Sequence, residues 1–133
     1  MKKVFLGGTC NESTWRDELI PKLAIDFFNP VVEDWTEECM AREREERENC
    51  DICLYVITPL MAGAYSIAEV VDDSNKRPEK TVFFVQEEDK DETGLRLFTL
   101  GQLKSLNQVG EMVARNGGFY AKTYDELLAF LNG

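Results

Sequence analysis

The sequence contains no histidine among its 133 residues. Without an imidazole side chain, a Ser-His-Asp triad, a Cys-His pair and a histidine-based metal site are all excluded. If the protein is an enzyme, carboxylates must therefore carry the acid–base and nucleophilic chemistry. The chain has 25 Asp and Glu residues, so the position of each one decides which of them acts.

Long apolar runs are also missing from the chain. No stretch approaches the roughly 20 apolar residues that are needed to span a bilayer. The apolar run within residues 1–8 is too short for the core of a signal peptide, and we interpret it as a first strand. We therefore expect a cytoplasmic protein with no membrane partner. Its length fits one domain, residues 1–133, with a substantial core.

Basic residues are scarce relative to acidic ones. The chain has 15 Lys and Arg residues and a formal net charge of −10. An acidic surface disfavours nucleic acids, because phosphate backbones are bound by Lys and Arg. It disfavours an anionic membrane for the same reason. A small nucleoside remains possible, since it is held by the chemistry of a groove rather than by the field of the whole protein.

Cysteine pairs of the kind that bind zinc are absent as well. Cys50 and Cys53 form a single C-x-x-C motif, which is accompanied by no second pair and no histidine. This argues against a tetrahedral zinc site or a thioredoxin motif and favours reduced structural thiols. We expect neither a metal nor a cofactor.

What the chain does contain is an alternation of apolar runs and helical patterns. Its continuous apolar run, Ile52–Ile57, is typical of a central parallel strand that is buried on both faces. The pattern predicts strands over residues 3–6, 24–28, 52–57, 80–85 and 119–121. It predicts helices from Asn11 or Ser13 to about 23, from Thr36 through the following charged segment, from Gly63 to about 75, over 100–115 and from Thr123 to 132, with an acidic loop at 86–92.

This alternation predicts an α/β fold with a doubly wound parallel sheet. Five strands suit a flavodoxin-like (Rossmann-like) three-layer sandwich with strand order 2-1-3-4-5. In that order a ligand crevice lies at the carboxyl ends of strands one and three. Two turns of small residues, Gly7-Gly8-Thr9 and Thr58 to Gly63, fall at that edge. The first leaves the backbone open to a ligand, although a simple tight turn explains it equally well.

Three polar or aromatic residues near strand ends are further candidates. Trp35 beside Asp34 follows strand two and offers a platform for a flat base; the alternative is that Trp35 covers the core. Asp51 precedes strand three, at the end opposite the crevice, where it could also be an ordinary turn residue. The charged run at residues 42–48 is interpreted as a solvated helix face with i,i+4 ion pairs.

Glu69 is the strongest catalytic candidate. It follows the Gly63 turn on a predicted helix, and the i,i+3 spacing places it on the same face as Ser66. Its neighbours in the sequence are apolar, and a carboxylate in such a setting is costly unless it faces a cavity or a partner. The alternative is an exposed helix residue.

The sequence resembles the nucleoside 2-deoxyribosyltransferase-like family. The matching segments are V-F-L-G-G-T at 4–9, F-N-P at 28–30, D-I-C-L-Y-V-I-T-P at 51–59 and G-A-Y-S-I-A-E at 63–69. The resemblance implies cleavage of the N-glycosidic bond of a 2′-deoxynucleoside or its nucleotide, with a base or water as the acceptor. A glutamate on a helix, here Glu69, would attack C1′ and form a covalent deoxyribosyl-enzyme.

The same resemblance assigns further residues and a partner. Phe5, Gly7 and Gly8 would line the sugar and base pocket, and Ser66 would lie near the nucleophile. Asp51 would match an acid that the family uses near the base. Members often complete each pocket from a neighbouring subunit, which implies a homodimer or larger homo-oligomer.

The chain differs from the family pattern at two places. Members often carry a polar or acidic group shortly before the nucleophile to hold the sugar hydroxyls, whereas this chain has Met61-Ala62-Gly63. An aromatic hydroxyl often orients the nucleophile, but residue 5 is Phe, and Tyr65 is a possible substitute.

Three functions stay open at the level of sequence. The first is transfer or hydrolysis of 2′-deoxynucleosides. The second also cleaves a glycosidic bond, but in a 5′-monophosphate or an NAD-type substrate. The phosphate of that substrate would be held by the backbone at Gly8-Thr9 and by Ser66. The third is a nucleotide-binding or sensing module with little or no turnover.

Overall fold

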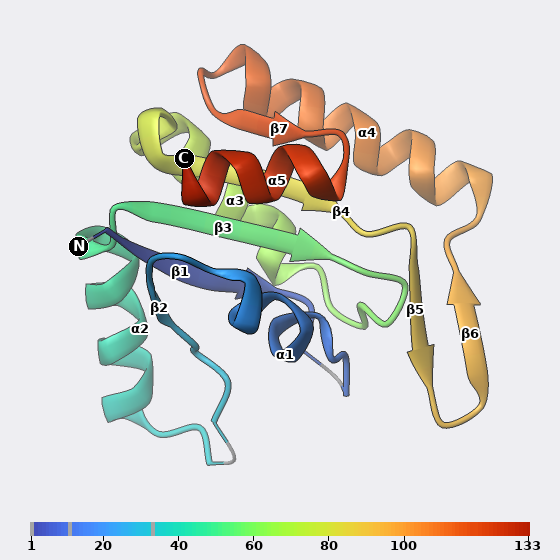
Figure 1. Ribbon diagram of the computed structural model, residues 1–133, viewed down its shortest axis with the longest axis horizontal. Coiled ribbons are helices and arrows are strands. Elements are labelled where there is room, and N and C mark those ends of the chain that lie inside the picture. The colour runs from blue at the N-terminus through green and yellow to red at the C-terminus, as the bar shows by residue number, and fades with distance from the viewer. Residues whose placement is uncertain (1, 11, 33) are drawn as a thin grey trace.

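A five-stranded parallel sheet forms the centre of the computed structural model, which describes residues 2–10, 12–32 and 34–133 (Figure 1). Its strand order is β2-β1-β3-β4-β7. The strands are β1 (Lys3–Gly8), β2 (Asp26–Phe28), β3 (Ile52–Ile57), β4 (Thr81–Val85) and β7 (Phe119–Ala121). Because β7 is the fifth parallel strand along the chain, the predicted flavodoxin-like order is confirmed.

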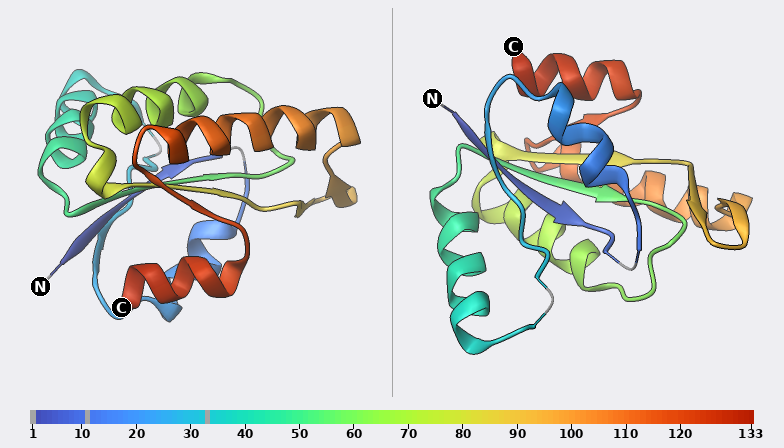
Figure 2. Two further views of the ribbon diagram at one scale, coloured as in Figure 1. Left: turned by 90° about the horizontal axis from the view of Figure 1, so that it is seen from above. Right: turned by 60° about the horizontal axis from the view of Figure 1, so that its bottom comes forward.

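Helices cover both faces of this sheet and complete the three layers (Figure 2). One layer holds α1 and α5, and the other holds α2, α3 and α4. The bounds are α1 (Trp15–Leu19), α2 (Glu37–Asn49), α3 (Tyr65–Lys76), α4 (Leu100–Arg115) and α5 (Tyr124–Asn132), with short 3₁₀ helices η1 (Ile20–Lys22) and η2 (Pro78–Lys80). None of the helices in the described ranges is long and apolar enough to cross a membrane.

The central strand β3 is buried along its whole length, as its apolar run predicts. Successive side chains of a strand point to opposite faces. Leu54 accordingly packs in the cluster beneath α1 and α5, whereas Tyr55 packs in the cluster beneath α3 and α4. The strand therefore joins the two halves of the core.

Strand β1 extends two residues further than the sequence predicts. Gly7 and Gly8, expected in a turn, pair with Tyr55 and Val56 of β3. A side chain at Gly8 is excluded twice, because its φ is +117° and a Cβ would lie 2.0 Å from the carbonyl oxygen of Val56. The paired glycines bring the two backbones together, and the chain turns only at Thr9.

The first helix is shorter than predicted. The expected helix to about residue 23 ends at Leu19 and continues as η1, which has Pro21 in its first turn, where its missing N–H costs no hydrogen bond. Ser13 is not the N-cap; its hydroxyl instead donates to Asp89 Oδ2 over 2.5 Å. Asn11, the other proposed cap, lies outside the described residues.

The predicted acidic loop at 86–92 is wrong. Residues Glu88–Asp91 form β5, which pairs in antiparallel register with β6 (Gly94–Leu97) in a hairpin that projects from one side of the molecule (Figure 1). Charged residues are rare in strands, which is why the segment reads as a loop. The turn between the two strands contains residues that are typical of turns. Gly94 has a φ of +117°, and the Asp91 carboxylate accepts the backbone N–H of Thr93.

The remaining elements agree with the sequence. Thr36 caps α2 by accepting the backbone N–H of Cys39 at 3.2 Å, and Thr123 caps α5 by accepting that of Glu126 at 3.1 Å. The Glu126 carboxylate accepts the N–H of Lys122 rather than that of Thr123, so Thr123 and Glu126 do not form a reciprocal capping box. The four cysteines are free thiols.

Candidate active site

A cavity of about 470 Å³ opens where β1 ends, between α2 and the first turns of α3. This is the sheet edge at which the fold places a ligand crevice. Its floor is backbone and Phe5, and its walls carry charged groups from three helices. The residues that line it are Phe5, Gly7, Gly8, Cys10, Arg16, Pro30, Trp35, Met40, Glu43, Arg44, Arg47, Tyr65, Ser66 and Glu69.

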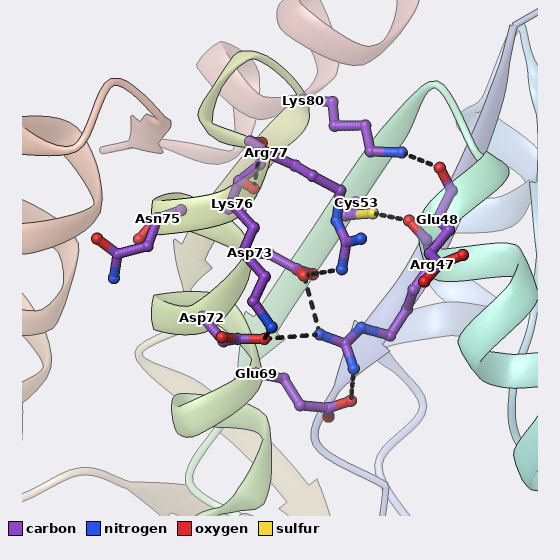
Figure 3. A network of polar contacts seen from close by, with 12 residues as sticks. Arg47, Glu48, Cys53, Glu69, Asp72, Asp73, Asn75, Lys76, Arg77 and Lys80 are labelled. Carbon is purple, nitrogen blue, oxygen red and sulfur yellow. Dashed lines mark hydrogen bonds and ion pairs between the residues drawn. The ribbon is translucent and has the colours of Figure 1, made fainter.

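Glu69 lies on the second turn of α3 with only 9% of its surface exposed. Its Oε2 is 3.2 Å from Nη1 of Arg47, a residue of α2 (Figure 3). Burial raises the pKa of Glu69 to about 7; the positive charge of Arg47 opposes this rise, and the nearby charges of Glu43 and Asp73 add to it. Glu69 is thus a buried acid on the cavity wall, and its carboxyl titrates close to neutral pH.

Arg47 is held by a second, deeper acid. Its Nη2 donates to Asp73 Oδ1 over 2.8 Å, and Arg77 Nη2 donates to the same oxygen over 2.6 Å (Figure 3). Asp73 is fully buried. Burial by itself would raise the pKa of Asp73, but hydrogen bonds from Arg47, Tyr55 and Arg77 outweigh it and lower that pKa. Asp73 therefore anchors Arg47 through hydrogen bonds that favour its ionised form.

Asp73 also contacts the sheet. The hydroxyl of Tyr55, on β3, donates to Asp73 Oδ2 over 2.5 Å. The Tyr55 ring in turn limits residue 7, since a Cβ on Gly7 would lie 2.7 Å from it. A continuous series of contacts thus joins the end of β1 to Glu69 through Tyr55, Asp73 and Arg47.

Glu43 brings a second carboxyl to the cavity. It lies one helical turn before Arg47 on α2, and its interaction with the Glu69 carboxyl raises the pKa of Glu69 and lowers that of Glu43. Burial raises the pKa of Glu43 too, and the charge of Arg47 opposes the rise. Two carboxyls and one guanidinium therefore meet on the wall of the cavity.

Arg16 contributes a buried positive charge. Its Nε donates to Leu6 O over 2.9 Å, Nη1 donates to Thr9 O over 2.6 Å, and Nη2 donates to Gly8 O over 3.3 Å. The side chain is 4% exposed, and burial lowers its pKa. These bonds fix the end of β1. Within the described residues Arg16 has no ion pair, so its charge is not balanced by a salt bridge.

The structure brings most of the predicted site residues together. Phe5, Gly7, Gly8, Ser66 and Trp35 all line the cavity with Glu69. Trp35 is 54% exposed, so it does not cover the core as the alternative supposed. Its position instead leaves an aromatic surface at the cavity.

Four predicted residues lie outside this group. Thr9 is buried behind the cavity, where its hydroxyl accepts the N–H of Thr58. Gly63 has open space around it, and Asp34 is exposed, with its carbonyl accepting the Cys39 thiol. Asp51 accepts the N–H of Lys3 over 2.8 Å at the amino ends of the strands, opposite the cavity. The turn role considered for Asp51 is the one that its contacts match.

The sequence reasoning missed the contribution of α2. The run at 42–48 is not only a solvated face, because Glu43, Arg44 and Arg47 line the cavity. The i,i+4 spacing of Glu43 and Arg47 was available as a signal, but alternating charges all around the helix hide which face is turned inward. Arg16, following Trp15, was missed as well.

The fold and this cavity define an α/β protein with a carboxylate-lined cavity at the switch point of its parallel sheet. Compared with known families, residues 1–88 match the model of the nucleoside 2-deoxyribosyltransferase-like family, which is 88 of 133 residues. The chain belongs to that family. The match includes every cavity-lining residue named above. No curated protein matches the chain.

Proposed function

We propose that this protein cleaves the N-glycosidic bond of 2′-deoxynucleosides or their nucleotides, with Glu69 as the nucleophile, and passes the sugar to another base or to water. The observation that carries the proposal is the burial of Glu69 on the cavity wall beside Arg47. Cleavage of this bond develops positive charge at C1′ and the ring oxygen, and a carboxylate in a partly dry cavity stabilises that charge strongly.

The geometry supports this role for Glu69. Arg47 lies 3.2 Å from Oε2, and the other carboxylate oxygen, Oε1, would attack C1′. The resulting ester would be the covalent deoxyribosyl intermediate. The backbone at Gly7 and Gly8 offers a close approach for the sugar, and Trp35 offers a surface on which a base could stack.

The test is release of free base from 2′-deoxynucleosides by the wild type and by Glu69→Gln. We expect Glu69→Gln to lose base release by at least about 1,000-fold, because the amide cannot form the ester intermediate. Trapping of the wild type with a 2-fluorinated nucleoside should add the mass of one 2-deoxy-2-fluoropentosyl group to the peptide that contains Glu69. Unchanged base release by Glu69→Gln would rule out its role as nucleophile.

The charges of the cavity favour a substrate that carries a phosphate. Arg16 is buried with no ion pair among the described residues, and an unbalanced buried cation is costly unless an anion joins it. Arg44 is exposed at the cavity and, within the described part of the chain, makes neither an ion pair nor a hydrogen bond. These cations supply the basic group that a 5′-phosphate site requires.

Comparing a deoxynucleoside with its 5′-monophosphate tests this preference. We expect kcat/KM to be higher for the monophosphate, and Arg44→Gln to reduce it for the monophosphate only. Arg42→Gln is the matched control, since Arg42 lies on the same helix but pairs with Glu46 away from the cavity lining. Equal kcat/KM values for both substrates would leave the nucleoside as the substrate.

A further inference from the structure

The departing base needs a proton, and Asp51, which the resemblance matched to an acid near the base, lies away from the cavity. Asp51 lies at the amino ends of the strands, bonded to the backbone of Lys3. Met61-Ala62-Gly63 adds no acid before the nucleophile. If the base is to leave as a neutral molecule, the acid that protonates it must come from another helix or strand that lines the cavity.

We infer that Glu43, on α2, is the general acid that protonates the leaving base and then the general base that activates the acceptor. This inference rests on the proposed function, since it presupposes that Glu69 is the nucleophile. Glu43 and Glu69 are the two acids among the described residues that line the cavity. Their carboxyls come from two different helices, α2 and α3, and each acts on the pKa of the other.

The setting of the pair divides the two roles. Arg47 forms its ion pair with Glu69, at 3.2 Å, and that pair favours the ionised form of Glu69. Glu43 lies one turn away on the same helix as Arg47 and has no ion pair within the described ranges. In the free protein the contact between the two carboxyls raises the pKa of Glu69 and lowers that of Glu43. A substrate that enters between them removes this contact, and the ion pair with Arg47 then leaves Glu69 as the charged group and Glu43 as the protonated one. Two carboxyls with unequal surroundings are the usual basis for an acid and a nucleophile in one site.

Other charged groups surround the pair. Arg44 and Arg47 on α2 and Arg16 on α1 act on Glu43. Glu69 faces Arg47 and Glu43 from α2, Asp73 on its own helix, and Tyr55 on β3. Burial raises the pKa of both carboxyls, that of Glu69 to about 7.

The proposed reaction has two steps. In the first, a Glu69 oxygen bonds to C1′, the C1′–N bond breaks, its electron pair goes to the base, and the Glu43 proton neutralises that base. In the second, water or an incoming base attacks C1′ and gives its proton to the Glu43 carboxylate. The electron pair of the C1′–O bond returns to Glu69, and both carboxyls are restored.

The experiment compares Glu43→Gln with the wild type on two leaving groups. An ordinary 2′-deoxynucleoside needs protonation of its base, whereas 4-nitrophenyl 2-deoxyriboside releases a stable phenolate without it. We expect Glu43→Gln to lower sugar transfer to Glu69 from the nucleoside by about 100-fold or more, the usual contribution of a general acid. For the nitrophenyl substrate, measured as the burst of nitrophenolate in the first turnover, we expect a change of less than about threefold.

A pH profile gives a second readout. For the nucleoside, kcat/KM of the wild type should fall on both sides of an optimum, and Glu43→Gln should lose the alkaline limb. Glu45→Gln is the matched control, because Glu45 is on the same helix but exposed and away from the cavity lining. Glu45→Gln should retain the rates and the profile of the wild type.

Two results would overturn the inference. Equal slowing of both substrates by Glu43→Gln would mean that Glu43 only shapes the cavity or orients Glu69. Wild-type rates on the nucleoside would mean that another group supplies the proton. Failure of the proposed function looks different, because the wild type would then release neither leaving group, or Glu69→Gln would release both.

Discussion

One face of the sheet is covered by α1 and α5 and the other by α2, α3 and α4, and the two layers are packed with different chemistry (Figure 2). Beneath α1 and α5 the buried side chains form an apolar cluster that includes Leu19, Leu54 and Leu127. The other layer has its own apolar cluster, but it also buries Asp73 at 0% exposure and Glu69 at 9%.

The difference shows where the molecule gains stability and where it holds its chemistry. An apolar cluster stabilises the fold by removing surface from water, in proportion to the area buried. A buried ionic network gains far less, because desolvation of the charges offsets their attraction. In this network Arg47 Nε and Arg77 Nε even lack a hydrogen-bond partner among the residues that the structure describes. We infer that the network is present to fix Arg47 and Glu69 rather than to stabilise the fold.

We expect the largest loss of stability when Asp73, the residue that holds Arg47 in the layer of α2, α3 and α4, loses its charge. Asp73→Asn keeps the shape of the side chain but removes the charge that holds Arg47 and Arg77. The free energy of unfolding should fall by about 3–5 kcal/mol, as when one partner of a buried ion pair is removed. Base release by the folded variant should fall too, since Arg47 would no longer be fixed against Glu69. Urea unfolding and initial rates measure both quantities.

Leu127→Ala makes the corresponding change in the apolar layer. Leu127 is fully buried beneath the sheet, so the variant loses apolar contact and leaves a cavity. We expect a loss of about 3 kcal/mol in the free energy of unfolding. Below its unfolding temperature, the rate per folded molecule should match the wild type. A lower rate per folded molecule would show that the two layers are not independent.

The smallest effect concerns the pH dependence of stability. The pKa of Glu69 is about 7 in the folded protein, against an ordinary value of 4.5. Between these two values the folded state binds more protons than the unfolded state, so stability falls as pH rises through this window. Below about pH 4 the carboxyl is protonated in both states, and the penalty disappears.

Glu69→Gln carries no such charge and should gain stability relative to the wild type as pH rises from 5 to 8. The expected gain is about 1–2 kcal/mol, since one pKa unit corresponds to about 1.4 kcal/mol. Thermal or urea unfolding of both proteins across this range measures it. A constant difference between them would mean that Glu69 is ionised with an ordinary pKa. The variant Glu45→Gln, at an exposed position, should show no pH-dependent difference.

The architecture was largely predictable from local patterns. The run Ile52–Ile57 predicted the bounds of β3, and the helix over 100–115 was predicted from its apolar spacing. The hairpin at β5 and β6 was not predicted, because Glu88–Asp91 has the composition of a loop. The end of β1 was misplaced, since the pairing of Gly8 with Val56 depends on a strand more than forty residues away.

The sequence alone determined the α/β class and the absence of histidine chemistry, which follow from residue types and from short-range periodicity. Its resemblance to the family led to the prediction of Glu69 among 25 acids. Only the tertiary structure decided that Arg47 and Glu43, within an evenly charged helix, face Glu69, and that Asp51 lies at the far edge of the sheet. The packing of α2 against α3 selects which side of that helix is turned inward, and no local pattern in a uniformly charged segment encodes this choice.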